Sequence, residues 1–371
     1  MALKPLSVFI NGRFLTQPVT GVQRFAFEIL NSLDIYLSEH PDQSQRYKFT
    51  CFVPARSGKD TLPDWKNILI KQSGISHGNI WEQIELPYLA RKGLLLSLCN
   101  IGPLLHFHQI VIFHDASVFA VPEAYTLAFK IKYRISMWIL ARIARKVITV
   151  SQFSKKELAR YLKIRIDDIS LISEGCEHIL KSIPDYSTIW KNNLGKKPFI
   201  LTIGSSSPHK NVNSVIQAIA KFHGDEINLV IVGGKYSKVF KQVEEPENEH
   251  VVRLGYVTDS ELRALYEKAF CFIFPSLYEG FGLPPLEALA CGCPVLSSNK
   301  ASLPEIYRDA VLYFDPASEE GIYRTIKEFM EQTALHDDYQ KRGLLLAEGY
   351  TWKSAAESLF EIIRADDPYS P

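Results

Sequence analysis

Residues 275–287 read Pro-Ser-Leu-Tyr-Glu-Gly-Phe-Gly-Leu-Pro-Pro-Leu-Glu. An apolar run over 271–274 precedes them, and a helix is predicted from Leu286 to Cys291, with Gly292 available to end it. The stretch therefore predicts a glycine-containing turn between a strand and a helix, with a carboxylate on each side. In open α/β sheets, ligands bind at this carboxyl end of a strand.

The chemistry of this turn suits a ligand that has both phosphate and hydroxyl groups. Backbone N–H groups at the start of such a helix favour an anion. Gly280 and Gly282 let the backbone approach a ligand closely. Because a carboxylate repels phosphate, Glu279 and Glu287 are expected to bind hydroxyls, which predicts a nucleotide sugar. The alternative is that both glutamates only favour the helix dipole.

The sequence EGFGLPPLE, from Glu279 to Glu287, resembles the donor motif of the family-4 retaining glycosyltransferases. The resemblance extends from Asn11 to a last helix expected over 352–364. It implies an α/β fold of GT-B type, with two facing Rossmann-like, doubly wound parallel-sheet domains and an interdomain cleft. It also implies bacterial surface-polysaccharide assembly, such as mannosyl transfer in O-antigen or capsule synthesis.

Alternating strands and helices along the chain also predict doubly wound parallel sheets. Helices are expected over 23–37, 129–145, 213–222 and 259–269, the last with Thr258 or Asp259 as its N-cap. Strands are expected over 7–11, 47–53, 111–113, 147–150, 169–172, 199–203, 229–232, 251–254, 271–274 and 294–297. A polar, broken stretch near 176–197 separates the two series. We therefore predict an acceptor-side domain over 1–180 and a nucleotide-sugar-binding domain over 181–350. By the resemblance, the helix within 351–371 crosses back onto the first domain.

A second candidate phosphate-binding segment, residues 204–211, reads Gly-Ser-Ser-Ser-Pro-His-Lys-Asn. It follows a predicted strand and opens a predicted helix, and Lys210 supplies a cation for a diphosphate. The resemblance implies that Lys210 and the residue before it contact phosphate. Because relatives more often have arginine where this chain has His209, both phosphate binding and simple loop packing stay open for His209.

The N-terminal half offers three further candidates. His114 and Asp115 end a predicted strand and resemble the family's interdomain His-Asp segment. This implies that His114 lies across the cleft from Glu279, where it bonds a donor hydroxyl or orients the acceptor. Gly21 lies in the loop after the first strand, which in the family approaches the diphosphate and the acceptor. Arg24 either pairs with phosphate or lies on the helix surface.

The resemblance completes the predicted site. It places the nucleobase beside the strand over 251–254, with Tyr256 either stacking or packing, and assigns a donor-sugar hydroxyl to Glu279 and the ribose hydroxyls to Glu287. The predicted catalytic residues are His114, Lys210 and Glu279. The predicted donor-binding residues are Gly21, Gly204, Ser205, His209, Lys210, Arg253, Tyr256, Ser276, Glu279, Gly280, Phe281, Gly282, Leu283 and Glu287.

The mechanism expected from these residues needs no metal and no cofactor. The chain contains no Asp-x-Asp sequence, the pair that holds the metal in metal-dependent sugar transferases. Lys210, helix N-termini and His209 would instead stabilise the charge that develops on the leaving diphosphate. The resemblance implies a front-face reaction with retention, in which the departing phosphate oxygen takes the acceptor proton.

Composition favours a two-domain cytoplasmic protein. The six cysteines form no Cys-x-x-Cys pair, and we expect neither a signal peptide nor a membrane-spanning run. Residues 1–180 contain 22 lysines and arginines against 15 acidic residues, whereas the remainder contains 20 against 26. A basic N-terminal half would suit an anionic membrane surface or a phosphate-linked acceptor. The alternative is that the asymmetry is only scatter in surface charge. The basic stretch 130–146 is either a helix on the inner face of the membrane or a core helix with a solvated face.

The sequence therefore predicts a retaining hexosyltransferase. Its donor would be GDP-mannose or a UDP- or dTDP-sugar, its acceptor a glycan or lipid-linked oligosaccharide, and no nucleic acid would be a partner. The alternatives are a nucleotide-sugar epimerase or hydrolase on the same fold and a non-catalytic nucleotide-sugar-binding module. A nicotinamide oxidoreductase is disfavoured because no Gly-x-Gly-x-x-Gly opens either half.

Overall fold

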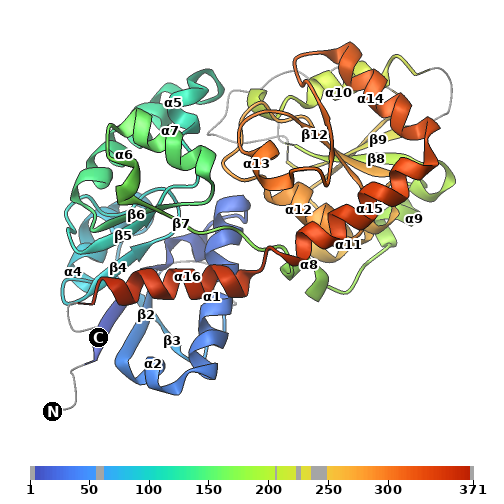
Figure 1. Cartoon of the computed structure of the whole chain (residues 1–371). Helices are drawn as coiled ribbons and strands as arrows, with labels where there is room; N and C mark the ends of the chain where they lie inside the picture. The colour runs from blue at the N-terminus through green and yellow to red at the C-terminus, as the bar shows by residue number, and fades with distance from the viewer. Residues whose placement is uncertain (1–4, 56–61, 205–206, 223–226, 235–248, 368–371) are drawn as a thin grey trace. The chain divides into compact units, whose positions relative to one another are not determined.

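The computed structural model describes residues 5–55, 62–204, 207–222, 227–234 and 249–367. The chain divides into two compact units, and each contains one parallel β-sheet (Figure 1). The N-terminal unit comprises Met1–Ala116, Ile131–Gly175 and Trp352–Pro371. The C-terminal unit comprises Ser117–Lys130 and Cys176–Thr351.

The sheet of the N-terminal unit has seven strands in the order β3-β2-β1-β4-β5-β6-β7. In chain order they are β1 (Leu6–Asn11), β2 (Tyr47–Pro54), β3 (Ile68–Ser73), β4 (Leu94–Ser97), β5 (Gln109–Ile112), β6 (Lys146–Thr149) and β7 (Ile169–Leu171). Every residue of β4 and β5 is buried, as expected for central strands of a parallel sheet. The strand order reverses between β1 and β4, which is the topological switch point of this sheet.

Helices follow most of these strands. They are α1 (Gly21–Glu39), α2 (Pro41–Arg46), α3 (Gly78–Ile80), α4 (Leu86–Leu89), α6 (Leu127–Ile143), α7 (Gln152–Leu162) and α16 (Trp352–Ala365). The first four residues of α6 belong to the C-terminal unit. Short helical turns cover Gly12–Thr16, Trp81–Glu85 and Ile166–Asp168. The last helix, α16, packs along α1, with the rings of Phe25 and Trp352 centred 5.7 Å apart and those of Tyr36 and Phe360 5.1 Å apart.

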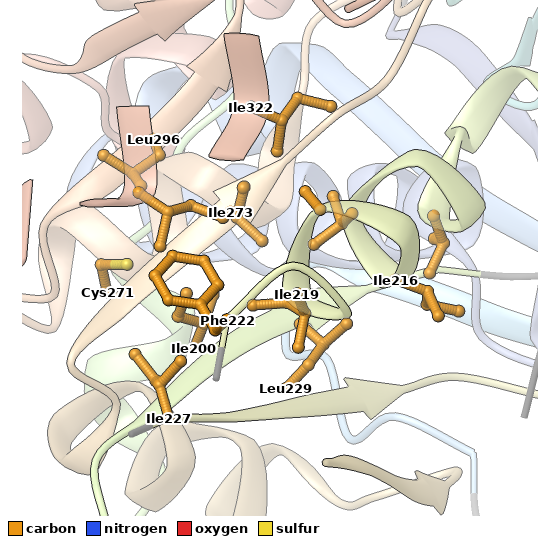
Figure 2. Packing of buried hydrophobic residues seen from close by; sticks show 14 of the residues in the cluster. Ile200, Ile216, Ile219, Phe222, Ile227, Leu229, Cys271, Ile273, Leu296 and Ile322 are labelled. Carbon is orange, nitrogen blue, oxygen red and sulfur yellow. The ribbon is translucent and has the colours of Figure 1, made fainter. Parts of the chain in front are cut away.

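The sheet of the C-terminal unit has six strands in the order β10-β9-β8-β11-β12-β13. They are β8 (Phe199–Ile203), β9 (Asn228–Val232), β10 (Val251–Gly255), β11 (Cys271–Phe274), β12 (Val295–Ser298) and β13 (Leu312–Phe314). The switch point of this sheet lies between β8 and β11. Figure 2 shows the core on one face, where Ile200, Ile273 and Leu296 of three strands lie with Ile219 of the neighbouring helix.

The helices of this unit are α5 (Ser117–Ala120), α8 (His178–Lys181), α9 (Ser187–Lys191), α10 (Val212–Ile219), α11 (Asp259–Lys268), α12 (Leu283–Ala290), α13 (Leu303–Tyr307), α14 (Glu319–Glu331) and α15 (Thr333–Glu348). Single turns cover Pro122–Ala124, Leu194–Lys196 and Pro208–Lys210. Thr258 is the N-cap of α11: its hydroxyl accepts from the Glu261 backbone N–H, and the Glu261 carboxylate accepts from the Thr258 N–H. This reciprocal capping box fixes where the helix begins.

The predicted fold class is confirmed: the chain is α/β, with two Rossmann-like parallel sheets. The strands predicted over 199–203 and 271–274 have those bounds in the structure. Strands β3, β4 and β13 were not predicted. Among the described residues, no helix combines the length and apolarity that crossing a membrane would need.

Candidate active site

Two loops meet at the switch point of the C-terminal sheet. One follows β8 and is described at residues 204 and 207–211, and the other follows β11 over 275–282. The backbone N–H of Leu277 donates to the carbonyl of His209 at 2.8 Å. The side-chain amide of Asn211 donates to the carbonyls of Pro275 at 3.2 Å and Pro316 at 2.8 Å. The two segments singled out in the sequence are therefore hydrogen-bonded to each other at the carboxyl edge of the sheet.

These loops bring Lys210 and Glu279 into contact. The Lys210 ammonium donates to the Glu279 carboxylate, with Nζ and Oε1 2.6 Å apart. The ammonium also lies 5.5 Å from the centre of the Phe274 ring. The side chains of Lys210 and Glu279 remain 25% and 13% exposed, so a ligand can reach both. The structure thus joins the predicted phosphate-binding cation and the predicted hydroxyl-binding carboxylate, which lie 69 positions apart in sequence.

The turn that holds Glu279 depends on Gly282 and on helix α13. Gly282 has a φ of +101°, and a Cβ there would lie 2.8 Å from a methyl of Leu303 and 2.9 Å from the Tyr307 hydroxyl oxygen. The Ser302 hydroxyl donates to the carbonyls of Glu279 at 3.0 Å and Phe281 at 3.2 Å. Residues at and within α13, which come after α12 and β12 in the chain, therefore fix the conformation of the turn.

Glu287 lies inside α12 and is buried. Its Oε1 lies 2.9 Å from Nε2 of His178, and its Oε2 accepts from the Tyr266 hydroxyl at 3.1 Å. Burial, and then the negative charge of Glu287, raise the pKa of Tyr266 well above its usual value, so Tyr266 stays a donor. Both carboxylate oxygens of Glu287 are thus fixed by protein groups, and its predicted bonds to ribose would add to these.

The other described donor-side residues around the two loops are buried. His209 is buried, and its Nδ1 lies 2.8 Å from the Ser207 hydroxyl oxygen. At Gly204, a Cβ would lie 2.3 Å from a methyl of Val212. Ser276 is buried, and among the described residues its hydroxyl has no hydrogen-bond partner. Phe281 and Leu283 are buried, next to Gly280 in the turn. Ser205 lies outside the described residues.

Arg253 and Tyr256 are not brought beside the Lys210–Glu279 pair. Arg253 lies in β10, the outermost strand, and Tyr256 directly follows that strand. Strand β9 separates β10 from β8. The Tyr256 side chain is 75% exposed, so within this unit it does not pack, and stacking on a nucleobase stays a prediction.

In the N-terminal unit, His114 is buried just after β5. Its Nε2 donates to the Leu98 carbonyl at 2.9 Å, and its Nδ1 lies 3.8 Å from a carboxylate oxygen of Glu174. The Phe25 ring meets the imidazole edge to face at 4.8 Å. Because a carbonyl can only accept, Nε2 carries the proton that is donated to Leu98, and Nδ1 faces Glu174.

The loop before α1 is more open. Gly21 is the first residue of α1, and nothing lies within 4 Å of where its Cβ would be. The Arg24 guanidinium lies 3.5 Å from the carboxylate of Glu28 one turn later. Phosphate binding by Arg24 stays a prediction.

A family comparison identifies the segment that holds the two loops. Residues 187–345 match the family described as glycosyl transferases group 1. This segment is a group 1 glycosyltransferase domain. It contains Lys210, Glu279 and Glu287. The predicted resemblance to glycosyltransferases is therefore confirmed, and sugar transfer is the activity of the chain.

Sequence relatives extend beyond this domain. The O-antigen chain mannosyltransferase B of Escherichia coli is 28% identical over 372 residues, which cover 91% of this chain and 94% of the relative. The O-antigen chain mannosyltransferase RfbU of Salmonella typhimurium is 31% identical over 240 residues, or 64% of each chain. Both alignments are long enough to include strands outside the group 1 domain.

Solved structures resemble the whole chain. Sucrose-phosphate synthase of Thermosynechococcus elongatus has a TM-score of 0.72 at 15% identity, covering 98% of this chain and 99% of its own. WaaG, a glycosyltransferase involved in lipopolysaccharide biosynthesis, has a TM-score of 0.69 at 14% identity, covering 96% and 99%. Anabaena HepE, solved with UDP and glucose, has a TM-score of 0.70 at 16% identity, covering 97% and 99%. The fold is therefore that of the GT-B glycosyltransferases.

Sequence reasoning missed His178, Ser302 and Tyr307. His178 contacts Glu287 across 109 positions, and no local pattern marks it. Ser302 and Tyr307 bind backbone carbonyls of the turn, a role that residue type alone does not indicate. Asn211 ends the quoted segment 204–211 and has a φ of +56°, a conformation in which asparagine is enriched. The asparagine at position 211 was therefore a sequence signal for the contacts between the two loops.

Proposed function

We propose that this glycosyltransferase is a retaining, metal-independent hexosyltransferase that uses a nucleotide-diphosphate sugar. The observation that supports this most is the Lys210–Glu279 pair on two bonded loops at the switch point of a group 1 domain. Open α/β sheets bind ligands at that position. The pair offers a cation for the diphosphate and a carboxylate for a sugar hydroxyl.

In the proposed complex, the diphosphate lies against Lys210 and the backbone N–H groups of the two loops. The Lys210 ammonium then exchanges the Glu279 carboxylate for phosphate oxygens, which releases Glu279 to accept from a hydroxyl of the donor sugar. Glu287, already held by His178 and Tyr266, turns its remaining lone pairs to the ribose. The cation and the loop dipoles stabilise the charge that develops as the glycosidic bond breaks.

Retention would follow from a front-face reaction. The departing phosphate oxygen takes the acceptor proton, so no protein nucleophile is required. Glu279 is unsuited to that role if it holds a donor hydroxyl. His114, whose ring is fixed by Leu98 and Phe25, would orient a donor or acceptor hydroxyl through Nδ1.

The donor and acceptor are proposed by analogy with the relatives. Two of them are named O-antigen chain mannosyltransferases, which favours GDP-mannose and a glycan or lipid-linked oligosaccharide acceptor on the cytoplasmic side of a membrane. The complex of HepE with UDP and glucose makes UDP-sugars the second set of donors to examine.

Transfer assays with purified protein test this function. GDP-mannose, UDP-sugars and dTDP-sugars are each incubated with mannosylated oligosaccharides, and NMR of the product gives the anomeric configuration. We expect transfer with retention, and Glu279→Ala is expected to reduce kcat by about a hundredfold because the donor loses its orientation. Glu320→Gln removes an exposed carboxylate of the Lys221 ion pair and serves as the matched control.

Three results would contradict the proposal. An inverted product would exclude the front-face reaction. Donor consumption without a transfer product would favour an epimerase or hydrolase. Donor binding without any turnover would favour a non-catalytic module.

A further inference from the structure

Helix α6 exposes a row of large apolar side chains. Ile131, Ile135 and Trp138 are 49%, 54% and 50% exposed. Their spacing of four and three residues places them on one face of the helix. Ser136, Met137 and Leu140 are the buried residues of α6. The helix therefore packs through one side and presents the apolar row on another.

A second row lies on the helical run from α3 to α4, residues 78–89. Ile80, Ile84 and Tyr88 are 63%, 68% and 66% exposed, at intervals of four residues. Trp81 and Leu86 of the same run are fully buried and anchor it to the unit. Scattered single apolar residues are normal on protein surfaces, but two ordered rows on helices are not.

The two rows are neighbours. Lys132 of α6 donates its ammonium hydrogen to the side-chain carbonyl of Asn79 in α3, with Nζ and Oδ1 2.6 Å apart. Asn79 directly precedes Ile80, and Lys132 directly follows Ile131. We call the six exposed side chains the two-helix surface: Ile80, Ile84, Tyr88, Ile131, Ile135 and Trp138.

The segment that contains α6 is strongly basic, and the segment that contains α3 and α4 has a small basic excess. Residues 127–146 contain six lysines and arginines and no acidic residue. Residues 71–92 contain three basic residues and two glutamates, Glu82 and Glu85. Glu82 is buried against Asn11 and Arg13, and Glu85 accepts from the backbone N–H groups of residues 75 and 76. Both carboxylates are therefore occupied within the protein, and the surroundings of the surface are positive.

Arginines accompany the two aromatic residues of the surface. The Arg142 guanidinium carbon lies 3.8 Å from the centre of the Trp138 ring, and that of Arg91 lies 3.9 Å from the Tyr88 ring. An apolar or aromatic row beside cationic groups is the composition that lies in the interface of an anionic bilayer. In that position the rings sit at headgroup level and the long basic side chains reach the lipid phosphates.

We propose that the two-helix surface binds the surface of a bilayer that contains anionic phospholipids. A second copy of the chain fits less well, because an interface between identical copies would bring like charges together. This proposal rests on the proposed function in one respect: membrane binding would bring the enzyme to a lipid-linked acceptor. It deepens that function by naming the surface that makes the contact.

Vesicle co-sedimentation tests the proposal without donor or acceptor. We expect the protein to bind vesicles of an equal mixture of phosphatidylcholine and phosphatidylglycerol, and to bind phosphatidylcholine alone much less. High salt should weaken binding because it screens the basic residues. The triple variant Ile84→Ser, Ile135→Ser, Trp138→Ser should reduce the partition coefficient at least about tenfold, since three apolar side chains no longer enter the interface.

The matched control is Leu344→Ser with Leu345→Ser, which removes two exposed leucines from α15 and should leave vesicle binding unchanged. Circular dichroism melting curves check that each variant folds. Binding to neither vesicle, or equal binding by the triple variant, would overturn the proposal. So would a dimer in light scattering that the triple variant abolishes without vesicles. If vesicle binding holds but no nucleotide sugar is ever used, the proposed function fails and this inference survives.

Discussion

At the scale of single residues, the carboxylate of Glu287 shows how a binding group is prepared in advance. The group is buried, and His178 and Tyr266 each donate to one of its oxygens. A buried carboxylate without such donors would be strongly destabilising, because burial removes its hydration. Two residues outside the 275–287 stretch therefore determine where Glu287 can offer its remaining lone pairs.

Replacement of His178 by alanine is expected to weaken both folding and nucleotide binding. The variant leaves Oε1 of Glu287 buried without this donor, which should lower the free energy of unfolding by about 1–3 kcal/mol. Urea denaturation measures that loss, and calorimetric titration with nucleoside diphosphate measures the affinity. His77→Ala changes an exposed histidine and should alter neither quantity. Wild-type stability in His178→Ala would show that the 2.9 Å contact contributes nothing.

The sequence predicted the parts of the site that depend on local order, and not the contacts between distant segments. Glu279 could be placed at the end of a strand because the apolar run 271–274 and Gly282 flank it within a few residues. Its partner Lys210 was predicted only as a separate phosphate-binding residue. The contact of Glu287 with His178 spans 109 positions and exists only once the sheet has brought α8 beside α12.

At the scale of helices and strands, burial explains part of what was predictable, although β4 is wholly buried and was not predicted. Strands β8 and β11 are almost wholly buried and read as continuous apolar runs. Strand β3 is an edge strand in which half of the residues are exposed and several are polar, and β13 has only three residues. Such short or polar strands owe their existence to hydrogen bonds with a neighbour, and composition alone gives no sign of those.

Helix α16 tests packing at this scale. Phe360 is fully buried, 5.1 Å from the ring of Tyr36 and 5.1 Å from the ring of Tyr47. Phe360→Ala should lower the free energy of unfolding of the N-terminal unit by about 3–5 kcal/mol, since it removes a large side chain from the contact with α1. Urea denaturation followed by circular dichroism measures the change. Lys353→Ala, on the exposed side of the same helix, should stay within about 0.5 kcal/mol of wild type.

A loss in Phe360→Ala no larger than that in Lys353→Ala would show that α16 is not part of the core of this unit. A second contact with the N-terminal unit lies at the carboxyl end of α16. Asp367, two residues after α16, is buried and accepts from Arg46 at 2.7 Å and from the Tyr47 hydroxyl at 3.2 Å, so it also contacts the N-terminal unit.

At the scale of the whole molecule, charge is unevenly divided. Residues 181–371 contain 20 lysines and arginines against 26 acidic residues, yet this half holds the proposed diphosphate site. A diphosphate must therefore be stabilised by local positive groups, either those of the protein or a bound cation. Lys210 and the backbone N–H groups of the loops are the protein groups in question, whereas the basic excess lies in residues 1–180.

Removal of divalent metal distinguishes these two sources of charge. If Lys210 and the loop backbone suffice, sugar transfer in excess EDTA should proceed at the same rate as in magnesium. Lys210→Ala should reduce kcat by about 10²–10³, as loss of one group that stabilises developing charge does elsewhere, and by the same factor with or without magnesium. Steady-state transfer assays measure both rates, with Lys221→Ala, in an exposed ion pair on the same unit, as the matched control. Activity that disappears in EDTA and returns with magnesium would mean that a metal ion, and not Lys210 alone, neutralises the leaving diphosphate.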